Sequence, residues 1–193
     1  MFVMKINLVD EQIYKTLYLA DARYALIESD HKQSTNYKLE LSMLSKFSVM
    51  EFCGWIEVSM DSILKTYLKL KVKDRTAFDG ANHDVDRVYG CDPDKHIRPM
   101  VRQILGAKSF ARYVKKFADL DQICASVDLI GGKPSSSCLM AGYKPQPKRN
   151  VAAHTYLMPS TQAYFNAPSK VMHELKVVHP LLWSFRKSIL RFC

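Results

Sequence analysis

Apolar residues recur at steps of three and four along most of this chain, and that spacing is typical of amphipathic helices. The helical stretches are 10–30, 38–70, 94–118, 119–129 and 168–192. Strand-like alternation is confined to short pieces. We therefore predict an all-α fold, an up-and-down helical bundle with long loop insertions, in a single domain over residues 1–193.

The stretch 38–70 is the longest, and it is apolar on two sides. One stripe consists of Val49, Phe52, Cys53, Ile56, Met60, Ile63, Leu64 and Tyr67, and a second consists of Leu44, Phe47, Trp55 and Val58. A helix that is apolar on two faces is buried on two sides. Two interpretations remain: the second face meets another subunit, or the helix is the central one of a monomeric bundle.

Three features predict interruptions. Residues 71–94 carry two glycines, a proline and six aspartates, which predicts a loop insertion. The aspartates do not form a calcium-binding loop, because the D-x-D-x-D-G pattern is missing. Residues 131–147 predict a second loop, and Pro134 after Lys133 excludes a phosphate-binding loop there. Pro180 is expected to kink or divide the last helix.

Composition is that of an ordinary globular protein. The chain has 193 residues, 48% of them hydrophobic and 24% charged, which suits one domain with a buried core. Five cysteines, an odd number without C-x-x-C spacing, favour a reducing, cytoplasmic compartment. We find no signal-peptide pattern and no apolar run of membrane-spanning length, so we expect no membrane association.

Charge is one-sided. The formal net charge is +9 with a pI near 9.3, which favours polyanionic partners, nucleic acid first and an anionic membrane second. Stretch 94–118 carries Arg98, Arg102, Lys108, Arg112, Lys115 and Lys116 on its polar faces. This face either contacts phosphates or is simply solvated.

Residues 129–173 contain no Asp or Glu at all, and we call this stretch the acid-free window. Its basic side chains include Lys133, Lys144, Lys148 and Arg149. A site without acids does not repel an approaching phosphate. We therefore predict RNA contacts from Lys133, Lys144 and Lys148.

Within this window lies the sequence Lys148-Arg149-Asn150-Val151-Ala152-Ala153-His154-Thr155-Tyr156. Two prolines just upstream suit a helix that starts near Lys148, and residues four apart then share a face. An imidazole near neutral pKa transfers protons, and a guanidinium grips a phosphate through two parallel hydrogen bonds. Arg149 and His154, supported by Asn150, therefore suit metal-independent phosphodiester cleavage, with an RNA 2′-hydroxyl as nucleophile and no cofactor. The alternative is a chance spacing with a structural role.

The residues Arg149-Asn150-x-x-x-His154 resemble the R-x(4–6)-H signature of the HEPN superfamily, and Tyr156 extends the likeness to the toxins of HEPN–MNT toxin–antitoxin pairs. The resemblance implies a HEPN-type helical bundle that forms a homodimer with a composite ribonuclease site. It implies catalytic Arg149 and His154, a supporting Asn150, and Tyr156 as the residue that a nucleotidyltransferase antitoxin modifies.

The expected function is therefore an endoribonuclease acting as a toxin or anti-phage defence effector. One alternative is a non-catalytic HEPN module that binds RNA or nucleotide, or docks a partner protein. Another is a basic helical interaction protein in which the motif is structural.

Overall fold

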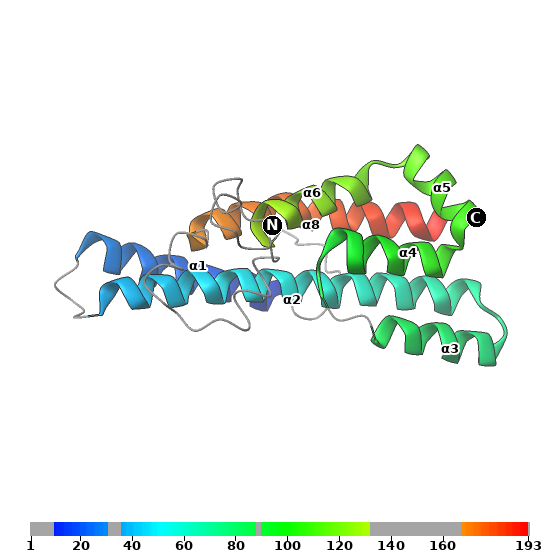
Figure 1. Cartoon of the computed structure of the whole chain (residues 1–193), viewed down its shortest axis with the longest axis horizontal. Coiled ribbons are helices and arrows are strands. Elements are labelled where there is room, and N and C mark those ends of the chain that lie inside the picture. The colour runs from blue at the N-terminus through cyan, green and yellow to red at the C-terminus, as the bar shows by residue number, and fades with distance from the viewer. Residues whose placement is uncertain (1–9, 31–35, 88–89, 132–166, 193) are drawn as a thin grey trace, which may run out of the picture.

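A computed structural model describes residues 10–30, 36–87, 90–131 and 167–192. Within these ranges the chain is helical and contains no strand, which confirms the all-α prediction. The helices form an elongated bundle (Figure 1). None of the described helices is long and apolar enough to cross a membrane.

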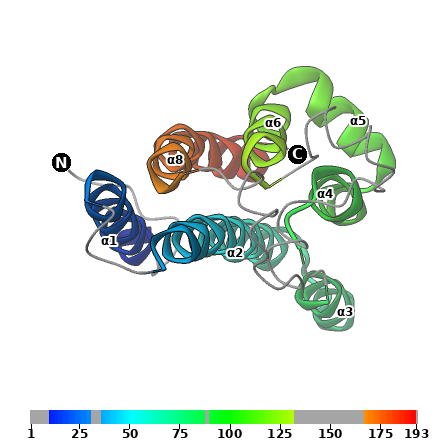
Figure 2. The same ribbon diagram turned by 60° about the vertical axis from the view of Figure 1, so that its left-hand side comes forward.

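The longest helix, α2 (Tyr37–Lys71), runs through most of the bundle (Figure 1). Helix α1 (Asp10–Ser29) and helix α8 (Pro168–Arg191) both pack on it, and α6 (Asp119–Gly131) packs on α8. Figure 2 shows α8 above α2, with α1 on one flank and α6 on the other. The predicted stretches 10–30, 38–70, 119–129 and 168–192 correspond to these four helices.

The core follows the first predicted stripe of α2. Val49, Phe52, Ile56, Met60 and Leu64 are all at most 1% exposed. They pack with buried residues of the other helices, namely Leu17 of α1, Leu120, Ile123 and Val127 of α6, and Val171, Leu175, Val178, Leu182, Phe185 and Ile189 of α8. Apolar burial of this extent is the main source of folding free energy.

The second predicted stripe of α2 is only partly correct. Trp55 is buried, whereas Phe47 and Val58 are exposed. They belong to a line of exposed apolar side chains at helical spacing, which we call the α2 stripe: Leu39, Met43, Phe47, Met50 and Val58. Gly54 falls on the same side, and no atom lies within 4 Å of the position that a Cβ would take there.

The prediction of a loop over 71–94 was wrong for most of that segment, because helix α3 (Arg75–Asp86) forms there. Asp74 caps it, since its carboxylate accepts a hydrogen bond from the backbone N–H of Ala77 at 2.8 Å. Phe78, Ala81 and Val85 are spaced at three and four residues and pack on the core. The turn-forming aspartate therefore begins a helix.

The stretch 94–118 is helical but not continuous. A π-helical turn η2 (Pro93–Ile97) leads into α4 (Arg98–Leu105), and α5 (Ala107–Lys116) follows. Gly106 separates α4 from α5 with φ 77° and ψ 150°, a conformation that is essentially restricted to glycine. The chain therefore changes direction at this residue, and α5 crosses from α4 towards α6 (Figure 2).

Pro180 was expected to kink or divide the last helix, and it does not divide it, because α8 continues through it to Arg191. Pro180 lies on the exposed side of the helix, whereas its neighbours Val178, His179 and Leu182 are buried. Packing of the inner face compensates for the hydrogen bond that the proline ring removes. The predicted loop 131–147 lies, apart from Gly131 at the end of α6, outside the described residues.

Candidate functional site

The residues of the predicted motif lie outside the described part of the chain. They are Arg149, Asn150, His154 and Tyr156, together with Lys133, Lys144 and Lys148. The site is therefore built here from the described residues that are able to receive its predicted substrate, a polyanion.

Charge is divided between the two halves of the sequence. Residues 1–94 contain 12 Lys and Arg against 15 Asp and Glu, a net charge of −3 (12 − 15). Residues 95–193 contain 16 Lys and Arg against 4 Asp and Glu, a net charge of +12 (16 − 4). The whole excess of positive charge therefore comes from the second half.

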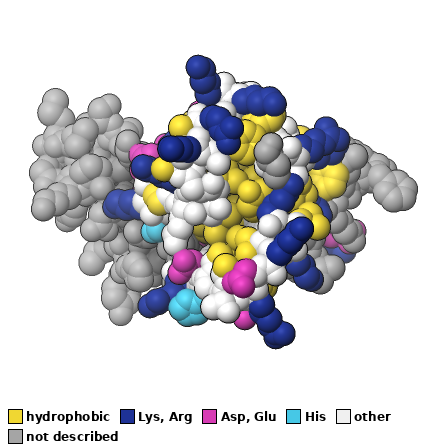
Figure 3. Space-filling view, turned by 90° about the vertical axis from the view of Figure 1, so that its right-hand side faces the viewer, with side chains coloured by type: hydrophobic (Ala, Val, Ile, Leu, Met, Phe, Trp, Pro, Cys, Tyr) yellow, Lys and Arg dark blue, Asp and Glu magenta, His cyan; other side chains and the backbone are white. Residues whose placement is uncertain are grey.

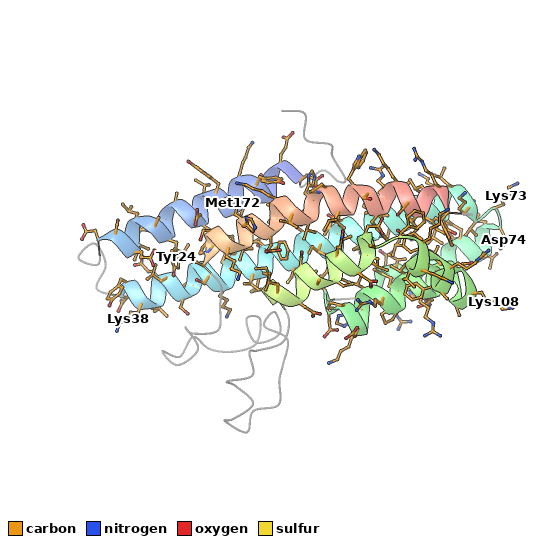
Figure 4. The ribbon with its side chains drawn as sticks, turned by 90° about the horizontal axis from the view of Figure 1, so that it is seen from above. Tyr24, Lys38, Lys73, Asp74, Lys108 and Met172 are labelled. Atoms are coloured by element: carbon orange, nitrogen blue, oxygen red, sulfur yellow. The ribbon has the colours of Figure 1, made fainter. Side chains whose placement is uncertain are left out.

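Two basic segments of this half meet at one end of the bundle. Helix α5 exposes Lys108, Arg112, Lys115 and Lys116, and the end of α8 exposes Lys187 and Arg191. We call these six side chains the basic end. Among the residues that the structure describes, none of the six forms an ion pair. Figure 3 looks onto this end of the molecule and shows a hydrophobic area bordered by Lys and Arg, and Figure 4 labels Lys108 there.

Aromatic rings lie beneath these cations. The guanidinium of Arg112 lies 5.8 Å from the ring centre of Phe192, and the ammonium of Lys116 lies 5.3 Å from that of Phe117. Phe117 and Phe192 contact each other edge-on, with ring centres 6.3 Å apart. Both rings are half-buried, so the end of the bundle presents positive charge and aromatic surface together.

A buried polar network fixes α5 to the rest of the bundle. The hydroxyl of Tyr113 donates to one carboxylate oxygen of Asp119 at 2.9 Å, and the hydroxyl of Ser188 donates to the other at 2.7 Å. The two hydroxyls also contact each other, and the backbone N–H of Leu120 donates to Asp119 at 2.8 Å. Burial, with a smaller contribution from the Asp119 carboxylate, raises the pKa of Tyr113 far above its ordinary value, so its hydroxyl keeps its proton.

This network joins three helices, since Tyr113 belongs to α5, Asp119 to α6 and Ser188 to α8. Tyr113 is completely buried, and its ring also lies edge-on to Phe185 and Phe192. The position of the exposed cations of α5 therefore depends on contacts below them. The sequence offered no signal for the network, because Asp119 and Ser188 are 69 residues apart.

A cleft opens between α4 and α5, on either side of Gly106. Its volume is about 640 Å³, within the usual range for small-molecule sites of roughly 300–1,000 Å³. Asp94, Arg98, Arg102, Gln103 and Phe110 line it, together with Pro99, Gly106 and Ala107. Phe110 supplies an aromatic surface and Arg102 an exposed guanidinium.

Arg98 holds one wall of the cleft in place. Its guanidinium binds Asp94 at 2.8 Å and Asp121 of α6 at 3.0 Å, so two carboxylates balance its charge. Arg102 has no ion-pair partner among the described residues. Of the two arginines in the cleft, Arg102 is therefore the one whose charge is available to a ligand.

A second buried polar cluster lies further along the bundle. The indole N–H of Trp55 donates to Asp10 at 2.9 Å, and Nε2 of His179 lies 3.4 Å from the other oxygen of Asp10. Tyr14 contacts the imidazole edge-on at 5.9 Å. The cluster ties α1, α2 and α8 together, and all its members are buried or half-buried. We assign it to stability, because its side chains are packed and hydrogen-bonded to one another between three helices.

The described part of the chain contains neither a metal-binding group of side chains nor a reactive cysteine. No group of three or more His, Cys, Asp or Glu residues there is arranged to hold a metal ion. Cys53, Cys91 and Cys124 are buried thiols that form no disulfide with one another. Burial raises the pKa of Cys124 to about 12, which keeps the thiol protonated and unreactive.

Comparison of the chain with protein-family models, with curated proteins and with solved structures gives no match. The candidate site therefore stands on the geometry of the basic end and its cleft, and on the sequence of the acid-free window.

Proposed function

We propose that this protein is a metal-independent endoribonuclease of HEPN type that cleaves RNA by attack of a 2′-hydroxyl. The observation that carries the proposal is Arg149-Asn150-x-x-x-His154 inside 45 residues (129–173) that contain no acid. The all-α fold and the net charge of +12 over residues 95–193 support it, because RNA cleavage needs a surface that attracts phosphates.

In this proposal each motif residue has a chemical role. His154 takes the proton of the 2′-hydroxyl and returns a proton to the leaving 5′-oxygen. Arg149 binds the scissile phosphate and stabilises the charge that grows on its oxygens. Asn150 orients the imidazole or contacts the phosphate, and Lys133, Lys144 and Lys148 bind the flanking RNA.

The proposal includes a homodimer, as the resemblance to HEPN proteins implies. The α2 stripe supports it, because five exposed apolar side chains in one line are typical of a helix that packs against a partner. Gly54 leaves room beside the stripe for close approach of a second helix. The α2 stripe of a second copy is the partner that we propose.

The biological role that we propose is that of a toxin or anti-phage defence effector in the cytoplasm. In that setting Tyr156 is the residue on which a nucleotidyltransferase antitoxin acts. A tyrosine two residues after His154 is close enough along the chain for its modification to block the motif.

Cleavage of a labelled single-stranded RNA in the presence of EDTA tests the proposal. We expect wild type to cleave, and Arg149→Ala and His154→Ala each to lose at least about 100-fold in rate, the usual lower value for a general acid–base group. Lys15→Ala on the outer face of α1 is the matched control and should cleave like wild type. Equal cleavage by both motif variants and wild type would remove the catalytic assignment.

A second candidate function is RNA binding without cleavage, and the basic end favours it because that surface suits binding whatever the motif does. It predicts a complex that weakens with salt and yields no cleavage products even with a large excess of protein. The same assay therefore separates the two functions.

A further inference from the structure

The strongest feature that the motif leaves unexplained is the basic end with the cleft beside it. The six cations have no acidic partner among the described residues, and α5 carries four of them on one outward side. A helix turns by about 100° per residue, so Lys108, Arg112, Lys115 and Lys116 fall within roughly a third of its circumference. This arrangement concentrates positive charge along a line.

Apolar and aromatic surface accompanies that line. Phe192 and Phe117 lie under Arg112 and Lys116, and Phe110 lines the cleft on the way to α4. Figure 3 shows hydrophobic side chains gathered at this end, with Lys and Arg along much of their border and Asp and Glu along one edge. A solvated basic face needs no such apolar area, whereas a ligand with both charges and flat rings would contact both parts.

From this juxtaposition we propose that α5, the end of α8 and the α4–α5 cleft bind single-stranded RNA. The phosphates contact Lys108, Arg112, Lys115, Lys116 and Arg191, and one unpaired base enters the cleft and stacks on Phe110 beside Arg102. Proteins that bind single strands combine these two elements, a basic track for the backbone and aromatic platforms for the bases. The choice of RNA rests on the proposed function.

The aromatic and apolar surface at this end favours a single strand over a duplex. In a duplex the bases are stacked inside, so the aromatic and apolar area at this end would have no partner. A single strand exposes its bases, and each base that stacks on an aromatic side chain gains binding free energy.

Binding is measured by fluorescence anisotropy with a labelled 20-nucleotide RNA, in the Arg149→Ala/His154→Ala background so that no RNA is cleaved. The test variant is Lys108→Gln/Lys115→Gln/Lys116→Gln. The matched control is Lys15→Gln/Lys38→Gln/Lys176→Gln, which removes the same charge from exposed positions elsewhere, Lys38 lying at the opposite end of the bundle from Lys108 (Figure 4). Circular dichroism and thermal melting confirm that each variant folds.

We expect the test variant to bind at least roughly 10-fold more weakly than the control. The slope of log affinity against log salt concentration should become shallower by about 2, since the variant removes three lysines and each phosphate contact on a single strand contributes about 0.7 to the slope. Phe110→Leu, which keeps the apolar volume but removes the ring, should weaken binding by about 5- to 150-fold and leave the salt dependence unchanged.

Three results would overturn the inference. The first is that the test and control variants lose the same affinity for RNA. The second is that the wild-type surface binds the duplex form of the same RNA as tightly as the single strand. The third is that the test variant keeps its RNA binding but no longer binds phosphatidylserine vesicles. Cleavage by the wild-type motif is measured separately. Loss of cleavage in the motif variants with unaltered RNA binding in the test variant would sustain the proposed function and reject this surface.

Discussion

Replacing Tyr113 by Phe tests whether the buried network sets the position of α5. The change removes one hydroxyl and leaves the ring contacts with Phe185 and Phe192 in place. The lost hydrogen bond joins a hydroxyl to a buried carboxylate at 2.9 Å, a kind that contributes about 1.5–3 kcal/mol. Asp119 keeps its bonds from Ser188 and Leu120, so we expect a loss of about 2 kcal/mol.

For a protein of this length, 2 kcal/mol lowers the melting temperature by about 4–8 °C. Urea and thermal denaturation at pH 7 measure the change. Tyr18→Phe is the control, because Tyr18 is 64% exposed and its replacement should stay within about 0.5 kcal/mol of wild type. A double-mutant cycle of Tyr113→Phe with Ser188→Ala should give a coupling free energy of about 0.5–3 kcal/mol.

The same variant has a signature at high pH. Burial raises the folded-state pKa of Tyr113 above its unfolded value of about 10, so the folded state holds this proton more tightly. Its stabilising contribution is complete below pH 10 and is lost as the pH rises further. The difference between wild type and Tyr113→Phe should therefore shrink above pH 10. A stability within 0.5 kcal/mol of wild type at pH 7 would refute the reasoning, because the network would then not hold α5.

Three further changes have definite expected results. Burial, assisted by Asp86 and Glu57 and opposed by Lys65, raises the pKa of Asp61 to about 6. Above that pH the folded state holds a charged, partly buried carboxylate, which lowers its stability. Asp61→Asn should therefore stabilise the fold by about 1 kcal/mol at pH 7.5, after allowance for solvent screening, and should not change its stability near pH 3.5. An equal gain at both values in urea denaturation would contradict this. Gly106→Ala should cost about 1–3 kcal/mol through its positive φ, whereas Gly80→Ala, in the exposed middle of α3, should stabilise by about 0.5–1 kcal/mol; changes of the same sign in thermal melting would refute the comparison. Met50→Glu in the α2 stripe should convert a dimer to a monomer in light scattering while Leu19→Glu on α1 does not, and a dimer in both variants would exclude the stripe as the interface.

The long helices could be predicted because their apolar periodicity extends over many turns. Along α2 the interior stripe from Val49 to Leu64 repeats often enough to override Gly54. Helices α1, α6 and α8 carry the same signal. Pro180 did not break α8, since the residues around it bury their side chains on the opposite side, and that compensation depends on neighbours which sequence patterns do not show.

Short elements were harder, because one residue decides them. Aspartate is common in loops, yet Asp74 caps α3. The apolar side of α3 has only three residues that pack on the core, which is too few to give a clear helical pattern in the sequence. Gly106 lies inside the stretch 94–118 that was predicted to be one helix, but its positive φ ends α4 and redirects α5. Local composition is the same in both outcomes, and tertiary packing selects between them.

Part of the candidate site could likewise be predicted from the sequence, and part of it could not. The basic face of 94–118 was visible in the sequence, and its exposure on α5 is confirmed. The aromatic rings beneath it were not predicted, because Phe192 reaches Arg112 from a position 80 residues along the chain. The roles of Arg149, Asn150, His154 and Tyr156 remain predictions to be tested by the cleavage assay.

Folding makes the second half of the chain more basic on its surface than its composition indicates. It has four acids, and Asp119 and Glu174 among them are buried, at 7% exposure each. Asp121 is bound to Arg98, and the fourth acid, Asp128, is exposed. Because buried acids are shielded from an approaching polyanion, the exposed Lys and Arg dominate the surface charge of this half. Net charge alone would have hidden this, since the acids of residues 1–94 offset it in the total.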